Sequence, residues 1–372
     1  MLVHVLVLNY NGRRLLAECL PSVLAAAAAS RHDCRVAVLD NDSSDGSASW
    51  LRQTFPEVEI FACRNEGLAS YNRVLPRLDG TVALLLNNDI KLSLDDVQPA
   101  VNPIDALVQP LLGERAGRQH CFMSAPCCYQ FDAATLEGFK TAVQWRYGLV
   151  QATGRFAGAE ACATVPDWTA SAGAALAVQR ELFVALGGFD PLYFPGRIED
   201  LDFAFRGYMA GHHAVYVPDS VVYHRGAATF GRAFGAAGND HLALRNTLLF
   251  QWKNLRHPRH LVRMALGWPL RLAVDLLQAP LVPSGARLRF ARACWQAAGC
   301  WRRRSTTLAA RRNPSAERTY FARFHPRAVR RRATWYRLSE RAETTTPRVV
   351  VCGAQSDTAT VTPTPVETVP SQ

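Results

Sequence analysis

Several common sequence patterns for binding nucleotides and metals are missing from this chain. There is no Gly-x-Gly-x-x-Gly turn and no Walker-type loop, so we do not expect phosphate to be held by backbone donors alone. The ten cysteines form no Cys-x-x-Cys framework, and the adjacent Cys127 and Cys128 do not match a zinc site. Because no signal peptide precedes the first apolar strand, we expect reduced thiols and a cytoplasmic protein.

Lysine and long apolar runs are also scarce. Only Lys91, Lys140 and Lys253 are lysines among the 42 basic residues. Residues 1–240 contain 19 basic and 25 acidic residues, whereas residues 241–341 contain 22 basic and three acidic ones. The excess positive charge therefore belongs to the C-terminal segment. That segment lacks the roughly 18 uninterrupted apolar residues that a membrane-spanning helix needs.

The basic C-terminal segment has helical apolar periodicity within residues 242–252 and 261–277. Two interpretations stay open: helices rich in Arg, Trp and Leu that lie against anionic lipid, or a helical extension packed on the rest of the protein. Arginine runs at 302–304 and 330–332 suit nucleic-acid phosphates, but no zinc-finger spacing, RNA-recognition motif or helix-turn-helix signal accompanies them. We therefore do not expect nucleic acid as a partner.

The most informative stretch is an apolar strand expected at residues 82–86, which ends in Asn87, Asn88 and Asp89. Five uncharged apolar residues suit a strand that is buried on both faces of a parallel sheet. The polar residues then lie at its carboxyl end, where open α/β sheets bind ligands. Because Asn and Asp also favour turns at strand ends, this motif alone does not separate a ligand site from a turn.

Polar residues end three further expected strands in the same way. In chain order they are Asn9, then Asp40 with Asp42, then Asn65. Helical segments between the strands give a βαβαβαβ order, which right-handed crossovers convert into a parallel sheet with these residues on one edge. A metal ion that joins a diphosphate to Asp89 suits such an edge.

The succession of these motifs resembles the nucleotide-sugar-dependent glycosyltransferases of GT-A fold, and within them the rhamnosyltransferase-like branch of family 2. The resemblance rests on residues 9–12, 40–47, 65–67 and 86–89 and covers residues 1 to about 232. It implies a Rossmann-like, mostly parallel α/β sheet. It also implies inverting transfer of a sugar from a UDP- or dTDP-linked donor, for example a rhamnose-like sugar.

The resemblance assigns roles to the residues at the strand ends. Asp40 contacts the base and ribose of the donor. The nucleotide-binding set as a whole is Asn9, Asp40, Asp42, Asn65, Gly67 and Asn88. Asp89 holds a divalent metal, Mn²⁺ or Mg²⁺, as the last residue of a DXD-type motif. Because Asn87 replaces the first acid of that motif, weaker metal binding or metal-independent donor binding stays open.

An acceptor-activating base is expected in the segment Glu199-Asp200-Leu201-Asp202. Three acids that open a helix also suit a first turn, where the helix dipole favours negative charge. The Glu-Asp pair resembles the acceptor-base motif of the family, which places the base at Asp200. Trp168, Gly173, Glu199 and Asp202 are then acceptor-binding or supporting residues; Tyr193 and Phe194 support the structure.

His224 follows the next expected strands, at 214–218 and 221–223. A lone histidine is often structural, but the resemblance places a second metal ligand here, and neutral imidazole suits manganese. Arg225 and Arg232 lie in the following Gly/Ala-rich stretch, where a mobile loop could close over a diphosphate.

We therefore expect a GT-A catalytic domain at 1–238, a basic helical extension at 239–343 and a disordered tail at 344–372. Elements between residues 92 and 163 cannot be placed from their pattern. The expected function is sugar transfer from a nucleoside diphosphate sugar to a glycan or lipid-linked acceptor in cell-surface polysaccharide synthesis, at the inner face of the cytoplasmic membrane. The alternatives are a sugar-nucleotide nucleotidyltransferase, which normally carries a basic Gly-rich loop after its first strand, and a non-catalytic glycan- or nucleic-acid-binding module.

Overall fold

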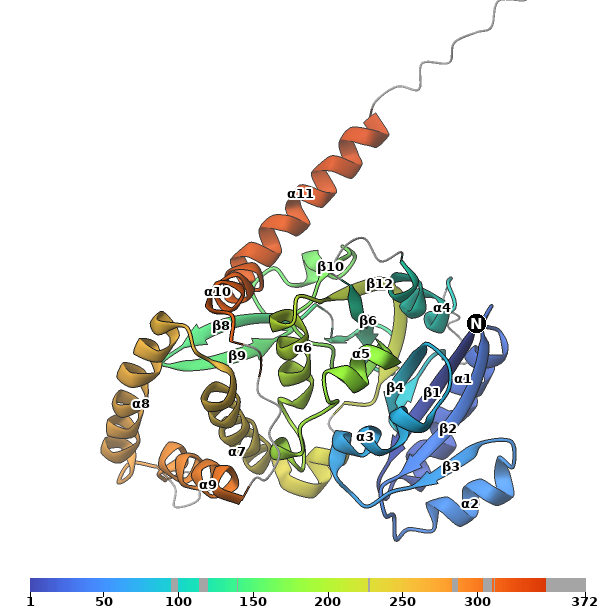
Figure 1. The fold of residues 1–372 in the computed structure, drawn as a ribbon, viewed down its shortest axis with the longest axis horizontal. Coiled ribbons are helices and arrows are strands. Elements are labelled where there is room, and N and C mark those ends of the chain that lie inside the picture. Colours follow the sequence, from blue (N-terminus) through green and yellow to red (C-terminus); the bar gives the residue numbers. More distant parts are fainter. Residues whose placement is uncertain are drawn as a thin grey trace, which may run out of the picture.

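A computed structural model describes residues 1–94, 100–113, 120–138, 140–226, 228–282, 287–303, 310 and 312–345, although side chains at 228–234, 236, 303 and 340–345 are not described. Figure 1 shows a sheet with helices on both faces beside a group of C-terminal helices. The expected tail at 344–372 lies almost wholly outside the described residues.

The N-terminal part alternates strands and helices, as its sequence predicts. Its elements are β1 Leu2–Asn9, α1 Arg13–Ala28, β2 Asp33–Asp40, α2 Ser47–Thr54, β3 Glu59–Ala62, the 3₁₀ helix η1 Gly67–Ser70, α3 Tyr71–Val74, η2 Leu75–Arg77, β4 Val82–Asn87 and β5 Ile90–Lys91. β1 pairs in parallel with both β2 and β4, and β2 pairs in parallel with β3. The expected parallel sheet is therefore confirmed for the first four strands, β1 to β4.

The middle of the chain widens this sheet with strands of mixed direction. Its elements are α4 Pro103–Val108, η3 Gln109–Leu112, β6 Cys121–Tyr129, β7 Leu136–Gly138, β8 Ala142–Arg146, β9 Leu149–Thr153, η4 Glu160–Cys162, β10 Asp167–Trp168, β11 Ala175–Gln179, α5 Arg180–Ala185, η5 Pro191–Tyr193, α6 Glu199–Met209 and β12 His213–His224. The strand order of the large sheet is β10-β12-β6-β11-β4-β1-β2-β3. β11 runs antiparallel to both β4 and β6, and β8 and β9 form a separate hairpin.

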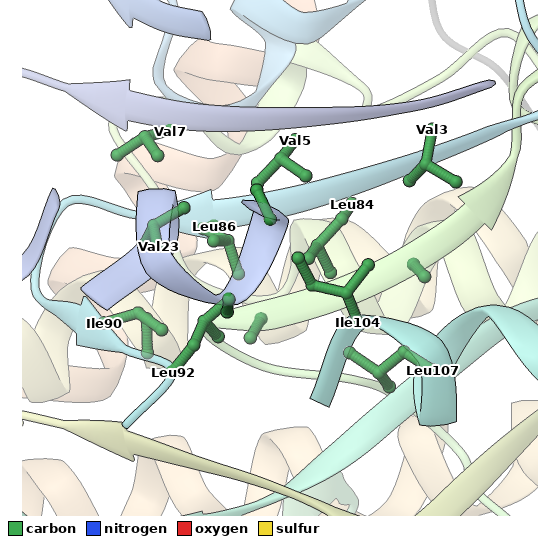
Figure 2. Packing of buried hydrophobic residues seen from close by; sticks show 14 of the residues in the cluster. Val3, Val5, Val7, Val23, Leu84, Leu86, Ile90, Leu92, Ile104 and Leu107 are labelled. Atoms are coloured by element: carbon green, nitrogen blue, oxygen red, sulfur yellow. The ribbon is translucent and has the colours of Figure 1, made fainter. Parts of the chain in front are cut away.

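Two apolar layers hold helices against the sheet. On one face, β1 and β4 present Val3, Val5, Leu84 and Leu86 to residues of α1 and α4 (Figure 2). On the other face, alternate residues of the same strands pack against α3, α5 and α6. Because β1 and β4 are buried on both faces, their sequences are continuous apolar runs rather than alternating ones.

The C-terminal helices are α7 Ala228–Asn254, α8 Pro258–Gln278, α9 Arg289–Arg303, α10 Pro314–Arg323 and α11 Pro326–Thr345. Helices α7 to α10 share one apolar cluster with the β8–β9 hairpin and α6, in which Leu248, Phe290 and Tyr320 pack with residues such as Val143 and Phe205. Val329 and Ala333 of α11 belong to a separate small cluster. α7 also crosses the expected boundary at residue 238. Among the described residues, no helix is long and apolar enough to cross a bilayer.

Candidate donor and acceptor site

The strand order reverses between β1 and β4, and the ends of these strands carry a chain of buried polar side chains. Asn88 donates from Nδ2 to Oδ1 of Asn9 at 2.8 Å, and Asn9 donates from Nδ2 to Oδ1 of Asp40 at 3.0 Å. All three residues are buried. In open α/β sheets, ligands bind in the crevice at such a reversal point. The structure therefore brings Asn9, Asp40 and Asn88 together at the expected edge.

Two loops close around this strand-end network. Asn11 accepts a hydrogen bond from the backbone N–H of Ser44 at 2.7 Å, which ties the loop after β1 to the loop after β2. A Cβ added at Gly12 would lie 2.0 Å from Nδ2 of Asn88, so only glycine leaves room for the network. Asp42 is exposed and has a left-handed backbone with φ of 59°. Its carboxylate is thus at the surface beside the network.

The loop after β3 forms a third wall. Asn65 accepts a hydrogen bond from the backbone N–H of Gly67 at 3.1 Å. Gly67 has φ of 63°, and an added Cβ would lie 2.9 Å from the carbonyl oxygen of Pro195. Asn41 donates to the carbonyl of Gly67, while its own buried Oδ1 has no hydrogen-bond partner among the described residues. Sequence reasoning did not select Asn41, because a single amide beside Asp40 gives no separate signal.

Asp89 and His224 face each other at the same edge. β5 pairs with the end of β12, so that His224 lies opposite Ile90, the residue after Asp89. Nε2 of His224 lies 3.2 Å from Oδ1 of Asp89, and this buried oxygen makes no hydrogen bond to the described residues. Hard divalent ions bind ligand atoms at about 2.1 Å, so two neighbouring ligand atoms lie about 3 Å apart.

The Asp89–His224 pair fits part of a divalent metal site. The Asp89 oxygen, and the imidazole nitrogen once it has lost its proton, are ligand atoms that Mn²⁺ accepts. No group of three or more His, Cys, Asp or Glu residues that could hold a metal occurs in the described part of the chain. Two protein ligands would therefore need donor phosphate oxygens or water to complete the coordination.

Glu137 of β7 is a neighbour that sequence reasoning missed. Its Oε1 lies 3.0 Å from Nδ1 of His224, on the side of the ring opposite Asp89. Burial lowers the pKa of His224, but the two carboxylates, Asp89 and Glu137, outweigh this and raise the pKa to about 9. A carboxylate on the second ring nitrogen fixes the tautomer and orientation of a metal-binding histidine. Glu137 gave no signal because its strand has only three residues.

The expected base lies beside this edge. Asp200 is half-buried at the start of α6, and its Oδ2 accepts a hydrogen bond from Ser171 at 2.7 Å. Three residues after Ser171, the carbonyl of Ala174 accepts a hydrogen bond from the backbone N–H of Asn87. The segment that binds Asp200 thus leads directly to the end of β4.

Glu199, next to Asp200, is in a different environment. Burial, and then the negative charge of Asp200, raise the pKa of Glu199 to about 8. Its Oε2 is buried and has no hydrogen-bond partner among the described residues. Adjacent carboxyl groups in unlike environments commonly take different protonation states. At neutral pH, Glu199 is therefore mostly protonated.

The loop before α6 is strained and is fixed by α7. Arg197 and Ile198 have φ of 78° and 77°, a region that is rare for a β-branched residue such as Ile. Asn246 of α7 donates from Nδ2 to the carbonyl of Gly196 at 2.8 Å and to that of Arg197 at 2.9 Å. Asn246 is fully buried. Sequence reasoning missed this residue, because it lies in a helix remote from every motif.

Asp202 has a fully buried place on α6. It binds Lys253 of α7 at 2.8 Å, Arg206 at 2.8 Å and the hydroxyl of Tyr193 at 2.8 Å. Lys253 also binds Asp190 at 2.6 Å. Burial alone would raise the pKa of Asp202, but Lys253 and Arg206 hold it below its usual range. These contacts are those of a supporting residue.

Trp168 and Gly173 were expected to bind the acceptor or to support the site, and their surroundings fit the supporting role better. His213 is stacked on the Trp168 ring at 4.5 Å between centroids, and the Arg323 guanidinium lies 3.8 Å from the ring centroid. These neighbours cover the ring faces that a sugar would use. Gly173 has φ of 116° with open space around it, so its backbone conformation, and not crowding, is what requires glycine.

The two arginines expected in the stretch after β12 can be placed only in part. Arg225 pairs with Glu18, whereas the Arg232 side chain lies outside the described part of the structure.

The sequence of the strand-end region matches a known family. Residues 4–123, about a third of the chain, match the model described as glycosyl transferase family 2. This match supports a family 2 glycosyltransferase. With the strand order given above, it identifies the expected fold, an α/β sheet of the GT-A type followed by a helical C-terminal region. Among curated proteins, no relative matches the chain.

Three of the solved structures to which this chain is similar have low sequence identity and TM-scores below 0.5. GalNAc-T7 with UDP, GalNAc and Mn²⁺ has a TM-score of 0.44 and 16% identity over 68% of this chain, which spans only 48% of that one. Mannosyltransferase PcManGT from Pyrobaculum calidifontis, with GDP-Man and Mn²⁺, has a TM-score of 0.44 and 20% identity. The match covers 89% of this chain and 83% of that one. TarS 1–349 of S. aureus, with UDP-GlcNAc, has a TM-score of 0.47 and 13% identity. The match covers 81% of this chain and 81% of that one.

Proposed function

We propose that this protein is an inverting glycosyltransferase that moves a sugar from a nucleoside diphosphate donor to a glycan or lipid-linked acceptor. The observation that supports this most strongly is the meeting of two half-sites at one sheet edge. The donor half contains Asp40 and Asp89, and the acceptor half contains Asp200. The Asn87–Ala174 hydrogen bond and the close approach of Gly67 to Pro195 join the halves.

The strand-end network would bind the nucleoside. Asn9 holds Oδ1 of Asp40, and the backbone N–H of Ser43 donates to Oδ2 of Asp40 at 3.2 Å, so the carboxylate has a fixed orientation. A fixed carboxylate can accept hydrogen bonds from ribose hydroxyls or from the N–H of a uracil or thymine ring. We therefore favour a UDP- or dTDP-linked donor, with Asn65 and Gly67 at the wall of the same pocket.

Asp89 and His224 would hold the divalent ion. When bound, such an ion neutralises the charge that develops on the departing diphosphate. Glu137 would accept the Nδ1 proton of His224 in a hydrogen bond, and the metal would replace the proton on Nε2, which becomes the ligand atom. Because Asn87 supplies no carboxylate, metal affinity would depend strongly on the bound diphosphate.

Asp200 would take the proton of the acceptor hydroxyl. Ser171 orients its Oδ2, and the buried, protonated Glu199 adds no second negative charge near the attacking oxygen at neutral pH. Attack from the side opposite the diphosphate inverts the anomeric centre. Glu199, Asp202 and Asn246 would act by holding the start of α6 in place.

An exposed apolar face of helix α8 supports the proposed location at an anionic membrane surface. Val262, Leu266, Leu270 and Leu277 share one face of α8 and are more than half exposed; we call them the α8 stripe. Arg259 and Arg263 flank its beginning. An exposed apolar stripe with basic neighbours suits the interface of an anionic membrane. A lipid-linked acceptor of cell-surface polysaccharide synthesis, with a rhamnose-like donor sugar, would be used at such a surface.

The direct test is a screen of nucleotide sugars with and without Mn²⁺ or Mg²⁺, read by NMR of the anomeric proton. We expect metal-dependent release or transfer of the sugar from a UDP- or dTDP-linked donor, with inverted configuration in the first product. Retained configuration would contradict the mechanism. Synthesis of a sugar nucleotide from a nucleoside triphosphate and a sugar phosphate would instead indicate a nucleotidyltransferase.

A further inference from the structure

A cavity of about 640 Å³ opens among the C-terminal elements. Its walls come from β8, the beginning of α8, α10 and the beginning of α11, which lie together in Figure 1. The lining residues include none of the residues assigned above to the donor or acceptor half-site. We call it the arginine cavity, after its most numerous side chains.

The arginine cavity is strongly basic. Six arginines and three histidines line it, and no aspartate or glutamate does: Arg259, Arg263, Arg318, Arg327, Arg331, Arg332, His257, His260 and His325. Arg332 is balanced by Asp167 at 2.9 Å. Arg259, Arg318, Arg327 and Arg331 have no ion pair with any carboxylate in the described part of the chain. Like charges that converge without a counter-charge repel one another, so an anion between them would lower the energy.

The arginines converge from three separate helices. Arg259 and Arg263 come from α8, Arg318 comes from α10, and Arg327 and Arg331 come from α11. Arg327 and Arg331 are four residues apart and so share one face of their helix. A solvated basic face on a single helix would not bring five guanidinium groups around one hollow. This arrangement distinguishes the cavity from the exposed arginines elsewhere on the extension.

Ring stacking and one buried hydrogen bond hold the inner wall of the cavity. Nδ1 of the buried His260 lies 2.6 Å from Oε1 of Glu317. His260 stacks on Trp145 at 5.1 Å, and Arg263 lies over the same ring at 5.6 Å. These ring contacts fix Trp145 and Arg263 at the wall of the cavity.

We propose that the arginine cavity binds a phosphate or diphosphate group. Guanidinium groups bind phosphate oxygens in a two-pronged, charge-assisted geometry. A carboxylate ligand is less suitable than a phosphate, because it has fewer oxygens to accept hydrogen bonds from these arginines. This proposal does not rest on sugar transfer at the strand-end site, because the two sites share no lining residue.

The phosphate can come from a soluble molecule or from a lipid headgroup. The cavity begins where α8 begins, and the α8 stripe runs away from it along the same helix. A lipid phosphate in the cavity would therefore leave its chains near an apolar face. Soluble pyrophosphate and phosphatidic acid vesicles are probes that separate the two sources.

The test is calorimetry of the full chain with sodium pyrophosphate in EDTA, at constant ionic strength, since EDTA removes metal from the strand-end site. Arg263→Gln with Arg331→Gln removes one charge that α8 contributes to the cavity and one that α11 contributes. Arg52→Gln with Arg302→Gln removes the same charge from exposed positions outside the cavity and is the matched control. We expect the wild type and the control to bind equally, and the cavity variant to bind about tenfold or more weakly, because two charge-assisted contacts are lost.

A parallel experiment measures co-sedimentation with phosphatidylcholine vesicles that contain or lack phosphatidic acid. If a lipid is the source, phosphatidic acid increases binding, the cavity variant loses that increase and pyrophosphate competes. If the source is soluble, pyrophosphate binds in the cavity and phosphatidic acid has no cavity-dependent effect. Equal pyrophosphate affinity in the cavity variant and the wild type, or no binding of either probe, overturns the proposal. All variants are compared by thermal unfolding, so that a folding defect is recognised.

Discussion

At the scale of single residues, Glu199 and Asp200 show how adjacent carboxyl groups can take different tasks. Asp200 is half-buried and held by Ser171, whereas Glu199 is buried with an unpartnered oxygen. Only a group that reaches the acceptor can take its proton, and only a neutral neighbour avoids repelling the attacking oxygen. The two positions therefore give separate predictions.

Replacement of Asp200 by Asn keeps the size of the side chain and removes its basicity. We expect turnover to fall by about 10²–10⁴, the usual contribution of a general base, while donor affinity stays near that of the wild type. Initial rates and nucleotide calorimetry measure the two quantities. Asp219→Asn, in an exposed part of β12, is the control. Transfer by Asp200→Asn at nearly the wild-type rate would remove Asp200 from the base position.

Glu199 predicts a pH dependence of stability. Its pKa is raised to about 8 in the folded protein from an ordinary value of 4.5, so the unfolded chain loses this proton at lower pH than the folded chain. The contribution of Glu199 to stability is therefore fully present below about pH 4.5 and is lost as pH rises to about 8. Glu199→Gln should remove this loss and raise the unfolding temperature at pH 8 more than at pH 5. An equal change at both pH values would contradict the raised pKa.

Single residues also show what sequence could and could not predict. Asn9, Asp40, Asn88 and Asp89 could be selected because each follows an apolar strand, and parallel strands bring their ends to one edge. The hydrogen bonds that link Asn88, Asn9 and Asp40 agree with this convergence of strand ends. Glu137 could not be selected, because it meets His224 only through the pairing of a three-residue strand with β6.

At the scale of elements, α6 and α7 are joined by a buried ion-pair network. Lys253 of α7 lies between Asp190 and Asp202, and all three side chains are almost inaccessible to solvent. The network and Asn246 together hold the strained loop that precedes Asp200. Removal of Lys253 would leave the carboxylates of Asp190 and Asp202 buried without the positive charge that they share.

Lys253→Met should therefore destabilise the protein by about 3–5 kcal/mol, the usual cost of removing one partner of a buried pair. Urea unfolding at pH 7 measures this change. Lys91→Met is the control, because Lys91 lies 3.9 Å from Glu18 in a more exposed pair and should cost no more than about 1 kcal/mol. Equal losses in the two variants would show that the buried network does not stabilise the α6–α7 contact.

Element prediction succeeded where local pattern and burial agree. The first four strands and the helix that starts at Glu199 are found as expected, and the two C-terminal apolar stretches lie in α7 and α8. The interval 92–163 could not be assigned, although it contains β6 to β9. β6 is buried for most of its length and contains Pro126 and Ser124, so neither alternation nor a continuous apolar run marks it.

At the scale of the whole molecule, the C-terminal helices support the proposed acceptor half-site and also form a basic surface. Helices α7 to α10 share an apolar cluster with α6, and α7 supplies Asn246 to the loop before Asp200 and Lys253 to Asp202. The sequence left open whether these helices pack on the sheet or face lipid. The structure shows the packing, and the exposed α8 stripe leaves a surface for the second role.

The membrane role predicts co-sedimentation with phosphatidylglycerol vesicles that weakens as salt rises, because charges at the surface are screened over about 10 Å at 0.1 M ionic strength. Leu266→Glu with Leu270→Glu should abolish it without loss of stability, since both side chains are exposed. Val184→Glu, an exposed apolar residue of α5, is the control. Equal binding of all three proteins would show that the α8 stripe is not the contact surface.

The central claim, that the strand-end site binds a nucleoside diphosphate through a metal on Asp89 and His224, is tested most directly by calorimetry of UDP and dTDP with and without Mn²⁺. The wild type should bind one of these nucleotides much more tightly with the metal than in EDTA. Asp89→Ala should lose this metal-dependent gain while keeping its fold, because the remaining imidazole cannot hold the ion alone. Unchanged affinity and metal response in folded Asp89→Ala, or no binding of either nucleotide to the wild type, would contradict the account.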